Sequence, residues 1–185
     1  MKQLQIGVMG SAADLTYSED AEQIAEKIGK LIAEKNAILV FGAEKDSDSL
    51  STCACRGAQK AGGITVGVTY GKGKDLWDDD KAPTVIIPCG LERGGGREFS
   101  LVLSCDAVIA ISGGSGTLTE TAIAYQANIP VICLTGFGGW ADKLADTYLD
   151  DRKRILFRKA TTPEEAVEMA IKAARGTRKQ WRNKR

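Results

Sequence analysis

Short apolar runs rich in β-branched residues alternate with helix patterns along the whole chain, and this alternation constrains the fold more than any other feature. Such runs are typical of parallel strands covered on both faces. They predict strands at residues 3–9, 37–42, 64–70, 84–88, 106–111, 129–134 and 154–160. The stretches between them predict helices at residues 18–36, 50–61, 101–104, 115–127, shortly after 140, and 162–175. Repeated strand–helix units predict an α/β fold, a Rossmann-like doubly wound parallel sheet with helices on both faces.

The length and composition fit one domain. With 185 residues, 43% hydrophobic and 26% charged, the chain can bury a sizeable core. We expect a single domain over residues 1–175. Six Lys or Arg residues fall within residues 175–185, although the formal net charge of the chain is only +1. Residues 176–185 are therefore predicted to form a basic tail, a solvated terminus or a subunit contact in preference to a nucleic-acid contact.

The absence of histidine excludes several kinds of chemistry at once. Without His there is no Ser-His or Cys-His nucleophile pair and no histidine zinc site. The five cysteines are odd in number and scattered, which favours reduced core thiols over a metal site. No apolar run reaches 18 residues and no leader pattern begins the chain. We therefore expect a cytoplasmic protein without a membrane segment or a metal.

A glycine turn follows the strand predicted at residues 106–111. The sequence Gly113-Gly114-Ser115-Gly116-Thr117 leads into a helix, for which Ser115 or Thr117 is available as the cap. Glycines let backbone amides approach a ligand, and the first turn of a helix attracts anions, so this turn predicts a phosphate site. The alternative is that the glycines only form a tight turn. Neither the Walker nor the dinucleotide-binding pattern is present.

A second glycine loop, Gly10-Ser11, follows the first predicted strand. In a doubly wound sheet, ligands bind beyond the carboxyl ends of the strands, where the winding reverses. Both glycine loops are expected at this rim.

With these residues in place, the sequence resembles the Lonely Guy family, once labelled lysine decarboxylases, and the related molybdenum cofactor carrier proteins. Gly113, Gly114, Gly116, Thr117 and Glu120 match the family pattern Pro-Gly-Gly-x-Gly-Thr-x-x-Glu, and Arg97 precedes it at the family's spacing. The resemblance implies a homodimer or higher homo-oligomer with a site for a nucleoside monophosphate or similar ligand. Lonely Guy enzymes cleave the N-glycosidic bond of cytokinin riboside monophosphates. For this chain, the resemblance implies Arg97 and Glu120 as the catalytic pair.

The sequence departs from the hydrolases at four places. Ser112 replaces the Pro, Gly94 to Gly96 replace a Met-His-Glu type segment, Glu98 replaces a Lys, and an acidic loop at residues 44–48 replaces a glycine-rich one. With these changes the sequence resembles the carrier-related branch more than the hydrolases. The acidic loop is expected to repel phosphate.

Two hypotheses remain open. The retained Arg97 and Glu120 favour a phosphoribohydrolase that needs no cofactor. The departures favour a non-catalytic carrier of a nucleotide monophosphate or molybdenum cofactor. Glu120 has an alternative role as a carboxylate favoured by the helix dipole. The alternative role of Arg97 is a structural salt bridge, for which Glu120 is one candidate partner. Asp78 to Asp80 fit a solvated loop better than a metal site.

Overall fold

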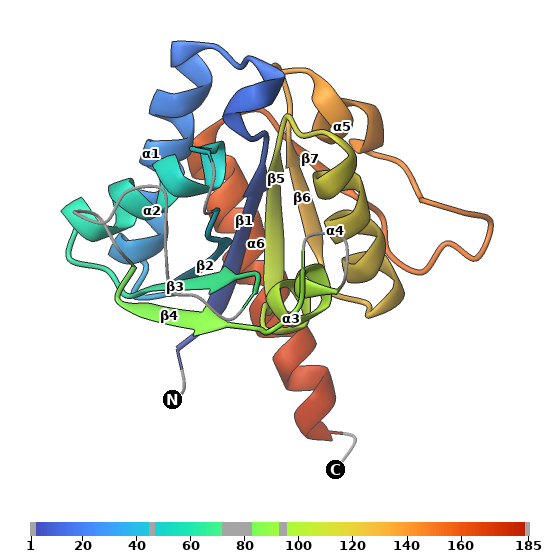
Figure 1. The fold of residues 1–185 in the computed structure, drawn as a ribbon. Coiled ribbons are helices and arrows are strands. Elements are labelled where there is room, and N and C mark those ends of the chain that lie inside the picture. Colours follow the sequence, from blue (N-terminus) through green and yellow to red (C-terminus); the bar gives the residue numbers. More distant parts are fainter. Residues whose placement is uncertain (1–2, 45–46, 72–82, 93–95, 184–185) are drawn as a thin grey trace.

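Seven parallel strands form one sheet in the order β4-β3-β2-β1-β5-β6-β7 (Figure 1). The computed structural model describes residues 3–44, 47–71, 83–92 and 96–183. The strands are β1 (Gln5–Gly10), β2 (Ile38–Gly42), β3 (Thr65–Thr69), β4 (Val85–Pro88), β5 (Ala107–Ile111), β6 (Val131–Leu134) and β7 (Arg158–Ala160). The winding reverses between β1 and β5, which pair with each other in the middle of the sheet. The predicted doubly wound α/β fold is confirmed.

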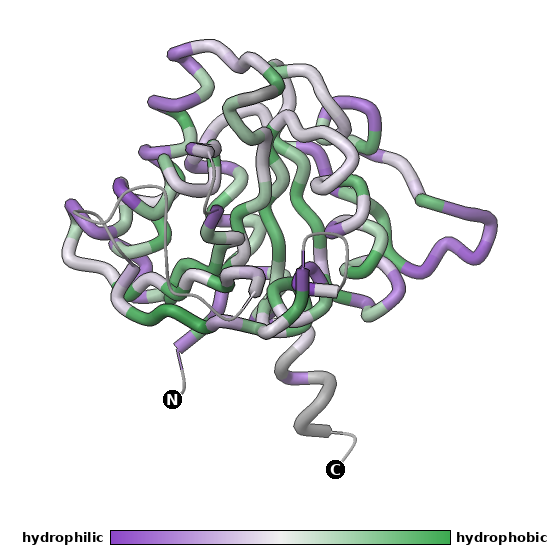
Figure 2. Tube along the Cα trace, viewed as in Figure 1, coloured by the Kyte–Doolittle hydropathy of each residue, from purple (hydrophilic) through white to green (hydrophobic). Residues whose placement is uncertain are grey.

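Helices cover both faces of the sheet. They are α1 (Glu19–Glu34), α2 (Leu50–Lys60), α3 (Arg97–Leu103), α4 (Ser115–Gln126), α5 (Gly139–Leu144) and α6 (Pro163–Asn183), with a 3₁₀ turn, η1, at Ala13–Leu15. One buried cluster joins the sheet to α1, α2 and α6, and a second joins it to α3, α4 and α5. The apolar strands lie between these clusters, and hydrophilic positions gather on the outer helices (Figure 2). Strands β2, β5 and β6 are apolar because both of their faces are covered, whereas the edge strands β4 and β7 are partly exposed.

Helices α1 and α2 pack with their backbones in contact. A Cβ atom added at Gly29 would lie 1.7 Å from the carbonyl oxygen of Ala54, and one added at Gly57 would lie 1.8 Å from that of Glu26. Only glycine permits this approach, since any side chain at either position would collide with backbone.

Several element boundaries differ from the prediction, most clearly in β7 and α6. Strand β7 covers only Arg158–Ala160 and not residues 154–160. The earlier residues bond elsewhere: the Arg154 amide donates to the Tyr125 hydroxyl at 3.1 Å, and the Phe157 amide to the Thr147 carbonyl at 2.9 Å. Helix α6 continues to Asn183, so most of the predicted tail is helical backbone, and its last turns extend beyond the body of the molecule (Figure 1).

Some predictions concern segments that lie outside the described residues, namely Asp78 to Asp80, Gly94 and Gly95. Within the described ranges, no helix combines the length and apolar character that crossing a membrane requires.

Candidate functional site

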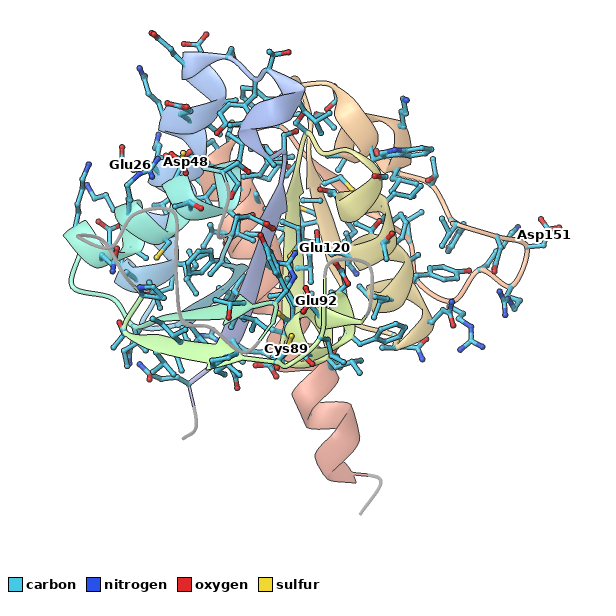
Figure 3. The ribbon with its side chains drawn as sticks, in the orientation of Figure 1. Glu26, Asp48, Cys89, Glu92, Glu120 and Asp151 are labelled. Atoms are coloured by element: carbon cyan, nitrogen blue, oxygen red, sulfur yellow. The ribbon has the colours of Figure 1, made fainter. Side chains whose placement is uncertain are left out.

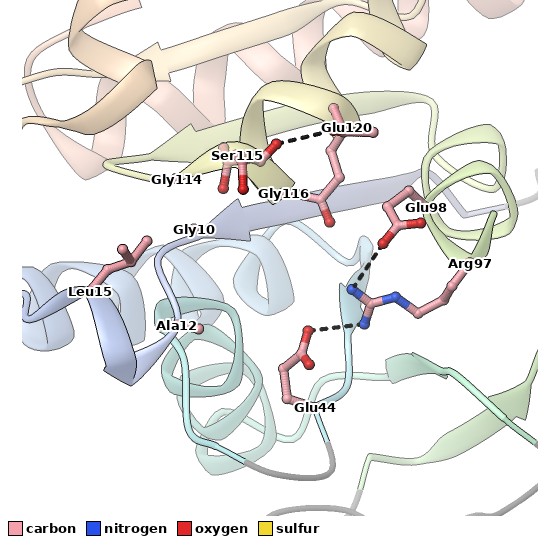
Figure 4. A pocket seen from close by; sticks show the side chains of 12 residues that line it. Gly10, Ala12, Leu15, Glu44, Arg97, Glu98, Gly114, Ser115, Gly116 and Glu120 are labelled. Carbon is pink, nitrogen blue, oxygen red and sulfur yellow. Dashed lines mark hydrogen bonds and ion pairs between the residues drawn. The ribbon is translucent and has the colours of Figure 1, made fainter. Parts of the chain in front are cut away.

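A pocket of about 360 Å³ lies at the point where the sheet winding reverses (Figure 4). It opens beside the carboxyl end of β1 and the loop between β5 and α4, which is where ligands bind in doubly wound sheets. The residues that line it are Gly10, Ala12, Leu15, Glu44, Arg97, Glu98, Gly114, Ser115, Gly116, Thr117, Thr119 and Glu120. Most of the predicted site residues are therefore brought together, while Ser11 and Gly113 are not among the described lining residues.

The glycine turn after β5 is held in a strained conformation. Ser112 has φ 54° and Gly113 has φ 97°, both in the left-handed region. A Cβ atom at Gly113 would lie 2.4 Å from Cβ of Thr117, so only glycine fits there. The Gly113 amide donates to Oγ of Ser11 at 2.8 Å, and the Ser11 hydroxyl donates to Oγ of Ser112 at 3.1 Å. Ser11 thus fixes the turn and does not reach the pocket.

The first turn of α4 presents its backbone amides to this pocket. Gly114 is the N-cap, with no side-chain cap, so the predicted cap at Ser115 or Thr117 is wrong. The strained turn places the N-cap at Gly114. Ser115 and Thr117 therefore lie inside the helix, where their hydroxyl groups cannot act as the cap. The Leu118 amide donates to the Gly114 carbonyl at 3.1 Å, so the amides of residues 115–117 precede the helical ladder. With the helix dipole, they form a seat for an anion.

Arg97 begins α3 and is only 5% exposed. Its Nη1 donates to Oε1 of Glu44 at 3.1 Å, and its Nη2 lies 3.9 Å from Oε1 of Glu98 (Figure 4). The guanidinium carbon also lies 5.7 Å from the centre of the Tyr70 ring. The buried Nε has no hydrogen-bond partner in the described structure. The salt bridge considered between Arg97 and Glu120 is not formed; Glu44 and Glu98 take that place.

Glu120 points from α4 toward the Arg97 ion pairs (Figure 4). It is 7% exposed and lies in the interior of the molecule, unlike Asp151 at the tip of a projecting loop (Figure 3). No described residue forms a hydrogen bond or ion pair with its carboxyl. Burial is the largest cause that raises the pKa of Glu120 from 4.5 to about 8; Arg97 lowers this pKa, and the carboxylates of Glu44 and Glu98 raise it. Glu120 is therefore mostly protonated at neutral pH.

The described lining carries three carboxyl groups and one cation. The α4 end attracts an anion, whereas the end near Arg97 offers carboxyl groups to hydrogen-bond donors. The sequence predicts that the acidic loop containing Glu44 repels phosphate. It does not predict that Glu44 and Glu98 both pair with Arg97. No spacing signal links these three residues in the sequence. Among the described residues, no group of three or more His, Cys, Asp or Glu side chains is arranged to hold a metal.

The chain is similar to known proteins over most of its length. The model of the SLOG cluster4 family matches residues 3–167. The chain belongs to this family. An uncharacterized protein of Archaeoglobus fulgidus is 31% identical over 174 residues, which cover 94% of this chain and 99% of that protein.

Two solved structures extend the comparison to proteins with a named ligand. The molybdenum cofactor binding protein of Rippkaea orientalis is 30% identical with a TM-score of 0.77, covering 93% of this chain and 98% of that one. The molybdenum cofactor carrier protein of Chlamydomonas reinhardtii is 29% identical with a TM-score of 0.75 over the same shares, 93% and 98%. The sequence resemblance to the carrier-related branch is confirmed.

Proposed function

We propose that this protein binds a phosphorylated small ligand of the molybdenum cofactor type, a pterin phosphate, and carries it without turnover. One observation carries the proposal: the uncapped start of α4 opens onto the pocket, while Arg97 is already engaged by two carboxylates. The ligand's phosphate then binds the amides of residues 115–117 and not Arg97. The similarity to cofactor-binding proteins supports the same ligand class.

A second function, hydrolysis of a nucleoside 5′-monophosphate to base and ribose 5-phosphate, is favoured by the protonation of Glu120. A buried carboxyl that is neutral at pH 7 is suited to act as a general acid toward a leaving base. Glu44 or Glu98 could then stabilise a cationic sugar. In this alternative, Glu120 is the acid and Arg97 acts mainly through the carboxylates it holds.

Ligand content of the purified protein tests the carrier proposal. The protein would be expressed in a host that makes molybdenum cofactor, and molybdenum and oxidised pterin fluorescence would be quantified. The variant Gly116→Ala is decisive because Gly116 lines the pocket and a Cβ atom there meets nothing within 4 Å. The methyl group would occupy open space at the anion seat. The fold should gain roughly 0.4–1 kcal/mol from lower chain entropy.

We expect Gly116→Ala to lose most of the bound molybdenum and pterin. The same substitution at Gly62, just beyond the end of α2, is the control and should keep them, because a Cβ atom there also meets nothing within 4 Å and Gly62 lines neither this pocket nor the one described below. Equal content in both variants, or none in the wild type, refutes carriage at this site. Release of free base from a nucleoside monophosphate, detected chromatographically and abolished in Glu120→Gln, would instead establish the hydrolase.

The proposal includes a homodimer in the cytoplasm. All five cysteines are free thiols, as a reducing compartment requires.

A further inference from the structure

A second pocket, of about 490 Å³, lies between α6 and the amino ends of β6 and β7. We call it the basic pocket; it is lined by Pro130, Val131, Arg154, Ile155, Leu156, Arg158, Lys172, Ala173, Gly176 and Thr177. Val131 and Arg158 are the first residues of their strands. The site described above lies at the carboxyl ends of β1 and β5. The two pockets are therefore at opposite ends of the sheet.

The charges of the basic pocket are uncompensated. Arg154, Arg158 and Lys172, all exposed side chains, line it, and no Asp or Glu is among its described lining residues. None of the three forms an ion pair within the described part of the chain, whereas Lys27, Arg56, Lys60, Arg97 and Arg152 all do. Three cations that line one pocket without a counterion raise its positive potential, and a bound anion would offset that charge.

The rest of the basic pocket is largely apolar. Pro130, Val131, Ile155 and Leu156 contribute its wall, and Leu156 is 39% exposed. Its volume is within the range of small-molecule sites, which combine apolar walls with a few convergent polar groups. Guanidinium groups suit phosphate and carboxylate oxygens because they can bind both oxygens at once.

We propose that the basic pocket is a second binding site, for an organic anion that carries two or more phosphate or carboxylate groups beside an apolar ring or chain. Arg154, Arg158 and Lys172 bind the anionic groups, and the Ile155 and Leu156 side chains contact the apolar part. The inference does not depend on the function proposed for the first pocket.

Calorimetry with tripolyphosphate and ATP tests this site. Tripolyphosphate probes the cations alone, and ATP adds a ring, so ATP should bind more tightly. We expect Arg158→Gln to raise the Kd for both probes about tenfold, the typical effect of losing one hydrogen bond from a charged donor. Lys35→Gln is the matched control, because this substitution changes the net charge by the same amount. Lys35 is exposed at the end of α1, outside the basic pocket. It should leave both Kd values within twofold.

Backbone NMR separates the possible outcomes. With ATP, the largest amide shifts should fall on Val131, Arg158 and Gly176, and should persist in Gly116→Ala. Shifts centred on Gly116 and lost in that variant would overturn the proposal, because ATP would then occupy the first pocket. Equal weakening by Arg158→Gln and Lys35→Gln would also overturn it, as would tight binding of a single-stranded RNA oligonucleotide with no measurable ATP binding. If Arg158→Gln does not fold, Arg154→Gln serves in its place.

Discussion

At the scale of single residues, the chemistry of the first pocket depends on how one cation is shared. Arg97 pairs with Glu44 and Glu98, and its positive charge only partly offsets the burial of Glu120. Glu120 therefore remains a neutral hydrogen-bonding group at pH 7 that can both donate and accept. A carboxylate at the same position would add a further negative charge to a pocket that is proposed to bind phosphate.

The pKa of Glu120 makes a prediction for stability. Its folded pKa of about 8 lies above the unfolded value of 4.5, so the folded state binds the extra proton between these values. The contribution of the neutral carboxyl is complete below about pH 4.5 and is lost as the pH rises through about 8. Glu120→Gln keeps the shape and removes the titration.

Urea unfolding at several pH values provides the measurement. Between about pH 5 and pH 9, the unfolding free energy of the wild type should fall relative to that of Glu120→Gln. Taking the difference cancels the titrating groups that do not interact with Glu120. Parallel pH profiles for the two proteins would contradict the assignment.

At the scale of elements, the helix pair α1 and α2 depends on two glycines. The Cβ atom that Gly29→Ala introduces would lie 1.7 Å from a backbone oxygen of α2, and backbone cannot move aside as a flexible side chain can. We expect this variant to lose at least about 3 kcal/mol of unfolding free energy, the upper part of the range for overpacking. Gly176→Ala, also within a helix but facing open space, should be neutral or slightly stabilising. Urea midpoints compare the two, and similar midpoints would disprove the close contact.

The start of α5 fixes the glycine turn of the first pocket. The Trp140 amide donates to the Gly113 carbonyl and the Ala141 amide to the Ser112 carbonyl, both at 2.9 Å. Gly139 has φ 67°, and a Cβ atom there would lie 2.4 Å from the carbonyl carbon of Ser112.

Gly139→Ala should therefore lower both stability and ligand binding, although Gly139 does not line the pocket. Gly62→Ala has a similar φ of 72° with open space around it, so it should lose about 1 kcal/mol and leave binding unchanged. Thermal melts and bound-pterin content distinguish the two variants. Unchanged ligand content in Gly139→Ala would show that the turn does not need this support.

The sequence predicts the elements better than their contacts. Strand and helix positions follow from local patterns, as at residues 106–111, where burial on both faces requires an apolar run. The cap of α4 is not predictable from hydroxyl preference, because the strained φ of Gly113 decides where the helix begins. The pairing of Arg97 with Glu44 joins residues 53 positions apart. Such a contact depends on the order of the strands, which no local pattern carries.

At the scale of the whole molecule, one apolar face is left exposed by the described part of the chain. Phe99 and Leu103 on α3 are 56% and 58% exposed, and their i,i+4 spacing places them on the same side of the helix. Leu91 is also exposed, and Leu91 and Phe99 both approach Gly96. The same helix carries Arg97 and Glu98 toward the first pocket, so a second copy docked here would also hold one wall of that pocket in place.

We predict that the wild type is a homodimer through this α3 face, because apolar side chains gathered in one patch are commonly a protein interface. Light scattering should give twice the chain mass of 19.7 kDa. Leu103→Asp should yield a monomer with a preserved fold. Leu103 is already more than half exposed in the single chain, so the Asp carboxylate would be buried only at the dimer interface. Tyr148→Asp, at an exposed aromatic residue on the loop after α5, is the control and should remain dimeric. A monomeric wild type, or a Leu103→Asp variant that is still dimeric, would exclude this face as the interface.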